Sequence, residues 1–95
     1  MGFTTISSTQ LAASGAVFGG SARVKSIYVA HSATAGTVIL RDGGSTGTVR
    51  CTINTAAAVG EYNTVIPEPG IRCVNASGPY IAITGGVSFV TVFYD

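Results

Sequence analysis

Charged residues make up 9% of this 95-residue chain, against about 25% in an ordinary soluble domain, and the formal net charge is +1. The length allows one domain and is too short for a second. The basic residues are scattered and no apolar run approaches the roughly 18–20 residues of a membrane-spanning helix, so neither nucleic acid nor a membrane is expected as a partner.

The first 22 residues lack strong alternation. We expect a neutral N-terminal arm over residues 1–22, with room for a first strand, followed by a β-sandwich domain over residues 23–95. Met1 to Ile6 has neither the basic nor the apolar region of a secretion signal. The protein is therefore expected to be made in a cytoplasm and to leave it only as part of an assembly.

Alternation with a period of two residues predicts strands in the middle of the chain. Val24 to His31 is strand-like with apolar residues on both faces, and Thr37 to Arg41 alternates between apolar and outward residues. Asp42 to Gly47 has the composition of a hairpin loop. Val49 to Asn54 then places Val, Cys and Ile on one face of a further strand.

The C-terminal part continues the pattern. Pro79 to Thr84 alternates, and Gly85-Gly86 is interpreted as a second, tighter hairpin. Val87 to Tyr94 is mainly apolar on both faces, as in a strand covered on both sides. Because a small sandwich covers a strand on one side only, a partner subunit would supply the second cover. A loop of the same chain is the alternative.

These elements predict an all-β fold, a single antiparallel β-sandwich or jelly-roll-like domain of about 7–8 short strands. Gly, Ser and Thr replace the missing charges, so the surface is expected to be neutral and to lose water at little cost. Interface cores are similarly poor in Lys, Glu and Asp. The composition favours a domain packed against neighbours over a secreted or low-charge monomer.

No constellation of residues predicts catalysis. His31 is the single histidine and lies at the end of a predicted strand, without a nucleophile-elbow pattern in the sequence. Cys51 and Cys73 lack zinc spacing and are expected to be free buried thiols, with a single bridge between them as the alternative. We expect no enzyme activity, no metal and no cofactor.

The order of several motifs carries a resemblance. They are Ala35 to Gly44, Ile66 to Cys73, Gly78 to Ile81 and Val87 to Tyr94. Together they resemble small virion structural proteins of tailed bacteriophages, over residues 23–95. The resemblance implies a capsid decoration or cement protein, made in the host cytoplasm and located in the virion. Its partners would be copies of itself, as a dimer or trimer, and the major capsid protein or another virion protein.

We expect this assembly to bury apolar strand faces and to exchange arm residues 2–20. The predicted interface residues are Phe3, Ile6, Leu11, Tyr28, Tyr80, Phe93 and Tyr94. Two alternatives stay open. One is a tail, collar or fibre-attachment component of the virion. The other is a small carbohydrate-binding module for host attachment, in which tyrosines stack on sugar rings.

Overall fold

The computed structural model describes residues 6–95, except for the side chain of Tyr62. This part of the chain contains strands and no helix, and every strand pair is antiparallel. The strands are β1 (Ser7–Leu11), β2 (Gly15–Ala16), β3 (Ala22–Asp42), β4 (Thr48–Asn54), β5 (Gly60–Val65), β6 (Ile71–Cys73) and β7 (Pro79–Tyr94). The prediction of an all-β, antiparallel, sandwich-like domain is confirmed. Within residues 6–95 there is no helix with the length and apolar character that crossing a membrane requires.

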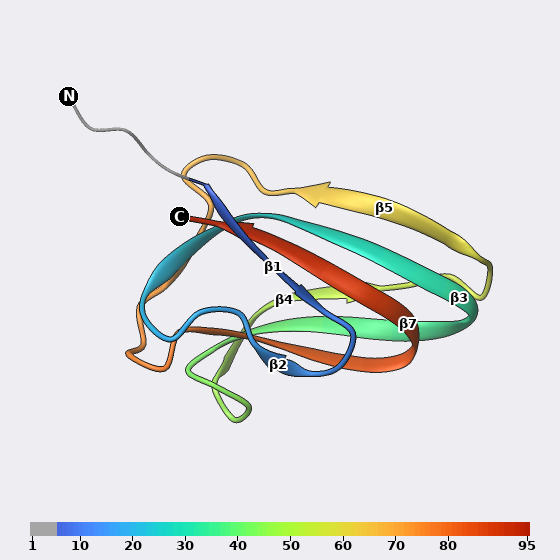
Figure 1. The fold of residues 1–95 in the computed structure, drawn as a ribbon, viewed down its shortest axis with the longest axis horizontal. Helices are drawn as coiled ribbons and strands as arrows, with labels where there is room; N and C mark the ends of the chain where they lie inside the picture. The colour runs from blue at the N-terminus through green and yellow to red at the C-terminus, as the bar shows by residue number, and fades with distance from the viewer. Residues whose placement is uncertain (1–5) are drawn as a thin grey trace.

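β3 and β7 are the framework of the sheet. They have 21 and 16 residues and pair with each other along most of their length. Figure 1 shows that both double back at the same end of the molecule, so that one sheet folds over itself into two layers. The prediction of short strands is wrong for these two, because each strand continues from one layer into the other.

The two layers are called the first and the second layer and are defined by the strands that they contain. In the first layer, residues 22–31 of β3 and 87–94 of β7 lie between β1 on one side and β5 and β6 on the other. In the second layer, residues 36–42 of β3 and 79–85 of β7 lie between β2 and β4. The molecule is 19 Å across its shortest axis, which fits two sheets packed about 10 Å apart with their outer side chains.

Glycines form the corner between the layers. Gly36 of β3 pairs with Gly85 of β7, and a Cβ on Gly36 would lie 2.4 Å from the carbonyl oxygen of Thr84. Gly85 has a φ of 71°, which disfavours other residues. The predicted hairpin at Gly85-Gly86 is therefore wrong. The backbone does change direction there, but it bends out of the sheet plane inside β7 and does not return beside itself.

The predicted hairpin after β3 is present. Asp42 pairs with Thr48 across the loop, and β4 covers the predicted strand from Val49 to Asn54. The register of this pair shifts between Leu40 and Arg41, which marks a bulge. The loop therefore joins two neighbouring strands of the second layer.

Bulges decide which side chains of β7 enter the core. Ala30 pairs with Phe89 and His31 with Val87, so Ser88 is an extra residue in β7. The extra residue brings Val87 to the same side as Val90, and both are buried. One core lies between the layers, with β3 and β7 as its main contributors. Its buried members are Val17, Val24, Ile27, Val29, Val38, Leu40, Cys73, Ile81, Val87, Val90 and Val92.

Part of the expected N-terminal arm belongs to this sandwich. β1 pairs with β7 in the first layer, and β2 pairs with β7 in the second. Val17, which follows β2, is 5% exposed, and its carbonyl oxygen accepts a hydrogen bond of 3.0 Å from Thr9 Oγ1. Residues 7–17 thus complete both layers of their own chain in this structure.

Candidate functional site

The outward side of the first layer carries an aromatic surface. Val90 and Val92 of β7 are fully buried, so alternation places Phe89 and Phe93 on the side that faces away from the core. Tyr28 of β3 lies beside them, with its ring centroid 6.1 Å from that of Phe89. All three side chains are only half-buried. We call Tyr28, Phe89 and Phe93 the aromatic band.

Apart from Glu61, the neighbours of the aromatic band are small, neutral or apolar. The register places Ser8 and Gln10 of β1 on the same outward side, opposite Phe93 and Thr91. Gln10 Nε2 donates a hydrogen bond of 3.3 Å to Thr91 Oγ1. On the other flank, Val65 of β5 is 73% exposed. The first layer therefore offers a surface with few ions to desolvate.

Glu61 of β5 places a carboxylate at the margin of this surface. It accepts a hydrogen bond from the Tyr28 hydroxyl. This bond, together with desolvation and the negative charge of Glu61, raises the pKa of Tyr28. Tyr28 is therefore a neutral donor at physiological pH. An apolar centre with a hydrogen-bonded polar margin is the usual make-up of a protein interface.

The second layer presents a different outward side. Because Leu40 is fully buried, its neighbours Ile39 and Arg41 face outward, and they pair with Ala82 and Tyr80 of β7. This side mixes small apolar, polar and cationic groups. It has no pair of rings in contact within residues 6–95, whereas the aromatic band does.

The predicted interface residues at the N-terminus have different positions. Phe3 lies outside the described residues. Ile6 is 50% exposed just before β1. Leu11 and Tyr94 instead pack against the core, and the Tyr94 ring lies 5.5 Å from that of Phe18. Leu11 and Tyr94 therefore stabilise the sandwich from inside and are poor interface candidates.

The structure brings together two of the other predicted residues. Tyr28 and Phe93 lie on the outward side of the first layer, whereas Tyr80 lies on that of the second. Phe89 was missing from the predicted set although the same alternation identifies it. Its closeness to Tyr28 depends on the β3–β7 register, which the sequence does not reveal.

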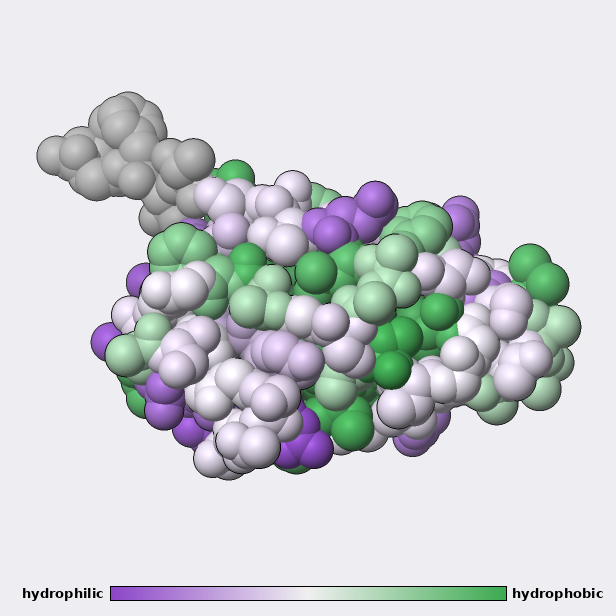
Figure 2. Space-filling view, turned by 60° about the horizontal axis from the view of Figure 1, so that its bottom comes forward, coloured by the Kyte–Doolittle hydropathy of each residue, from purple (hydrophilic) through white to green (hydrophobic). Residues whose placement is uncertain are grey.

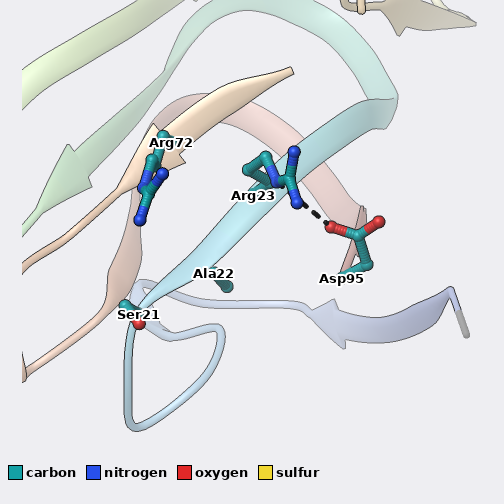
Figure 3. A pocket seen from close by; sticks show the side chains of 5 residues that line it. All are labelled: Ser21, Ala22, Arg23, Arg72 and Asp95. Atoms are coloured by element: carbon teal, nitrogen blue, oxygen red, sulfur yellow. Dashed lines mark ion pairs between the residues drawn. The ribbon is translucent and has the colours of Figure 1, made fainter. Parts of the chain in front are cut away.

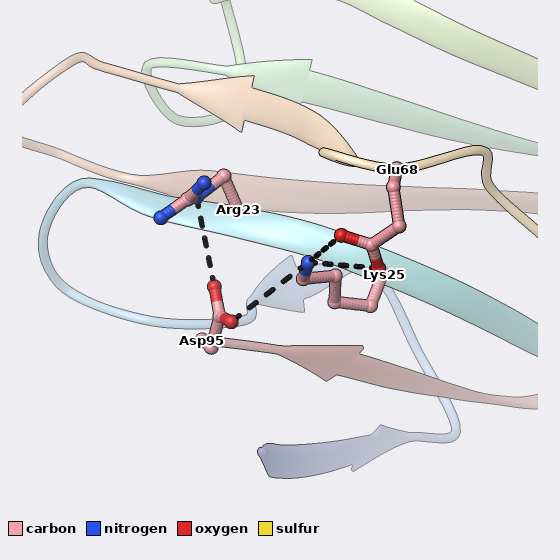
Figure 4. Close-up of polar contacts among 4 residues, drawn as sticks. All are labelled: Arg23, Lys25, Glu68 and Asp95. Carbon is pink, nitrogen blue, oxygen red and sulfur yellow. Dashed lines mark hydrogen bonds and ion pairs between the residues drawn. The ribbon is translucent and has the colours of Figure 1, made fainter. Parts of the chain in front are cut away.

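Three cations that are scattered in the sequence meet at one end of the molecule. Lys25 Nζ lies 2.8 Å from Glu68 Oε2 and 4.0 Å from Asp95 Oδ2. Arg23 Nε lies 3.7 Å from Asp95 Oδ1, so that Asp95 forms ion pairs with both cations (Figure 4). The third cation is Arg72 of β6, which is the register partner of Arg23.

Arg72 lines a hollow beside these ion pairs. Together with Ser21, Ala22, Arg23 and Asp95 it lines an open hollow of about 190 Å³ (Figure 3). Asp95 forms an ion pair with Arg23, and among the described residues no carboxylate forms one with Arg72. Like charges opposite each other on paired strands repel. Arg72 is therefore the one of the three cations that has no ion pair with a described side chain.

Asp42 is a buried carboxylate with a structural role. It accepts backbone hydrogen bonds from Val74 at 3.1 Å and Asn75 at 3.0 Å, and one from Arg50 at 3.3 Å. Burial alone would raise the pKa of Asp42, but the two backbone bonds and the Arg50 guanidinium outweigh it and hold that pKa below its ordinary value. The carboxylate thus fixes the segment after β6 to the end of β3.

The groups that could act as nucleophiles lie in the core or against it. His31 is 7% exposed, and its Nδ1 lies 3.3 Å from the Ser32 carbonyl oxygen. Cys51 and Cys73 are both free thiols. Burial, with the charge of Asp42, raises the pKa of Cys73 to about 11, and burial raises that of Cys51. Residues 6–95 hold no cluster of three His, Cys, Asp or Glu side chains that could bind a metal.

No protein-family model, curated protein or solved structure matches this chain. None of these comparisons links it to bacteriophage proteins. Its function is therefore argued from the surfaces described above.

Proposed function

We propose that the protein is a non-enzymatic structural subunit that assembles with copies of itself and with a larger particle. The observation that carries this proposal is the aromatic band. β7 is apolar on both sides, and only the side with Val90 and Val92 is fully buried within the sandwich. Phe89 and Phe93 on the other side are half-buried and available to a neighbour.

The size and surroundings of the aromatic band support this role. An aromatic side chain can bury roughly 150–250 Å². A specific interface buries about 800 Å² per partner. Because the three rings are already partly buried within the sandwich, they can supply the centre of such an interface, and the neutral residues around them would supply the rest. Figure 2 shows one face of the molecule, on which white and green residues prevail and the hydrophilic ones lie mainly toward the margin. Little charge would be desolvated when such surfaces meet.

We further propose that the particle is a bacteriophage head and that the subunit is a decoration or cement protein. Support comes from the order of the sequence motifs, the charged fraction of 9% and the compact β-sandwich-like fold. The partner would be the major capsid protein. A tail, collar or fibre-attachment component is the alternative, and immunogold labelling of virions with an antibody to this protein separates the two.

A carbohydrate-binding module that stacks sugar rings on its tyrosines has less support. Such a module would present several tyrosine rings on one platform. Tyr28 and Tyr80 lie on the outward sides of different layers, and Tyr94 packs against the core. These tyrosines therefore do not form a common platform.

Solution mass tests the proposal directly. We expect light scattering after size exclusion, with reduced thiols, to give a mass above that of the monomer that rises with concentration. Phe93→Ser should lower this mass because it removes a ring of the aromatic band. Val74→Ser is the matched control, since Val74 is 58% exposed in a loop outside the band. A wild-type protein that stays monomeric at millimolar concentration, or equal masses for both variants, contradicts self-assembly through the band.

A further inference from the structure

Among residues 6–95, β1 pairs with a strand on one side only, and it lacks the charge, proline or bulge that usually protects such an edge. It pairs with β7 through an uninterrupted register. Its sequence, Ser-Ser-Thr-Gln-Leu, has no charged residue and no proline. Natural edge strands are normally protected by charge, proline, bulges or short length, because their unpaired N–H and C=O groups attract other strands.

The other edges of the sandwich do carry such features. β4 contains Arg50 and a shift in its register with β3. β5 contains Glu61, and β2 has only two residues. β1 therefore differs from the edges of its own fold, and it lies beside the aromatic band.

The direction in which the backbone N–H and C=O groups of β1 point can be worked out from the hydrogen bonds between β7 and β3. Arg23 and Asp95 exchange both backbone hydrogen bonds, each of 2.9 Å. The backbone groups of Asp95 therefore point toward β3. In an antiparallel sheet these directions alternate along the strand, so the groups of Tyr94 and Val92 point toward β1.

The same alternation continues across β1. Ser7 and Thr9 are the partners of Tyr94 and Val92, so their backbone groups point to β7. The backbone N–H and C=O groups of Ser8 and Gln10 consequently point away from β7, to the free edge. This edge thus presents two residues whose backbone N–H and C=O groups can both form hydrogen bonds with a further strand.

We propose that β1 is a self-recognition strand, which adds to β1 of a second copy of this chain in antiparallel orientation. Centring the pair on Thr9 places Ser8 of each copy opposite Gln10 of the other, where both backbone hydrogen bonds can form. The second copy is the fitting occupant because β1 against itself brings no charges of the same sign together.

This geometry adds detail to the proposed function and rests on it. Antiparallel pairing of two identical edges creates a two-fold axis perpendicular to the joined first layers. Both aromatic bands then lie on the same side of one continuous sheet. Strand pairing would join the copies, and the combined aromatic surface would face the particle or a further subunit.

Hydrogen exchange and a proline substitution test the edge. We expect the amides of Ser8 and Gln10 to exchange slowly at high protein concentration and fast after dilution, because only a second copy covers them. Gln10→Pro removes an edge donor but no hydrogen bond to β7, so it should lower the mass of the complex by breaking the contact between paired β1 strands. Gln10→Ala is the matched control, since it keeps the N–H and should retain the larger mass.

The outcomes separate this inference from the proposed function. Fast exchange at Ser8 and Gln10 in an assembled protein overturns the strand pairing while leaving the structural role intact. Ser8→Pro provides a second variant if Gln10→Pro fails to fold, and an unchanged mass in the folded variant also overturns the pairing. Phe93→Ser should leave the exchange of both amides unchanged.

Discussion

Gly36 and Gly85 face each other across β3 and β7 at the point where both strands pass from one layer to the other. A Cβ on Gly85 would lie 2.4 Å from the Ala35 carbonyl oxygen, and one on Gly36 would lie 2.4 Å from that of Thr84. Both contacts are with backbone, which cannot rotate away as a side chain can. The close approach of two bare backbones is what allows the sheet to fold over.

Gly36→Ala is therefore expected to destabilise the protein. Forcing an extra methyl group into a packed site typically costs about 1–3 kcal/mol. Gly19→Ala is the control, because a Cβ there has no neighbour within 4 Å. It should change the free energy of unfolding by less than about 0.5 kcal/mol. Urea unfolding measures both, and equal stabilities for the two variants would refute this role of the corner.

The sequence predicted the strand-forming segments better than their connections. Alternation identified the segments from Val24 to His31 and from Thr37 to Arg41, which the structure shows to be one strand. A pair of glycines indicates a change of backbone direction. It does not distinguish a hairpin, in which the chain returns beside itself, from a bend that carries one strand from one layer into the other. Only the pairing of Gly36 with Gly85, which are far apart in the chain, distinguishes the two.

The aromatic band could be predicted from the sequence only in part, because alternation within one strand is visible in the sequence and the register between strands is not. Alternation along β7 separates Phe89 and Phe93 from the buried valines. The position of Tyr28 beside them depends on the register with β3. The meeting of Arg23 and Arg72 likewise depends on pairing between distant strands, so the cations look scattered in the sequence.

Asp42 predicts a loss of stability in acid. Its pKa is lowered in the folded protein, so it stabilises the fold at pH values above the ordinary aspartate pKa of about 3.9, and this contribution disappears as the pH falls through the lower, folded value. Asp42→Asn should destabilise the protein at neutral pH by about 1–3 kcal/mol, because a buried hydrogen-bond acceptor for Val74 and Asn75 is weakened.

Urea unfolding between neutral and strongly acid pH measures this effect. The difference in stability between the wild type and Asp42→Asn should narrow as the pH falls below about 3.9. Glu68→Gln is a suitable control, because the Glu68 side chain is 80% exposed. A difference that stays constant over the whole range would contradict the role assigned to the Asp42 charge.

Cys73 predicts resistance to thiol reagents. Its pKa is raised to about 11, so the reactive thiolate is scarce at neutral pH, and the side chain is fully buried. In a Cys51→Ser background, labelling of Cys73 by a thiol reagent should be no faster than unfolding. Mild denaturant should accelerate it in parallel with the unfolded fraction. Rapid labelling of the native protein would contradict this expectation.

The same thiol predicts a loss of stability in alkali. The unfolded thiol ionises near its ordinary pKa of about 8.5, whereas the folded one stays protonated up to about 11. Its contribution to stability is therefore complete below about pH 8.5 and declines as the pH rises toward the folded value. Cys73→Val has no such group, so its stability relative to the wild type should increase over this alkaline range.

Arg72 predicts an increase in stability on removal of its charge. It lies opposite Arg23 on paired strands, and the Asp95 carboxylate forms its ion pair with Arg23. Arg72→Thr should raise the free energy of unfolding by about 0.2–1 kcal/mol at low ionic strength, because like charges opposite each other destabilise a sheet. Salt at about 1 M should remove most of the gain, since it screens exposed charges beyond about 3 Å.

Arg50→Thr is the matched control for Arg72→Thr and should instead destabilise the protein, because Arg50 pairs with the buried Asp42. If Arg72→Thr destabilises as much as Arg50→Thr, then Arg72 is compensated in the folded chain and its repulsion with Arg23 does not lower stability.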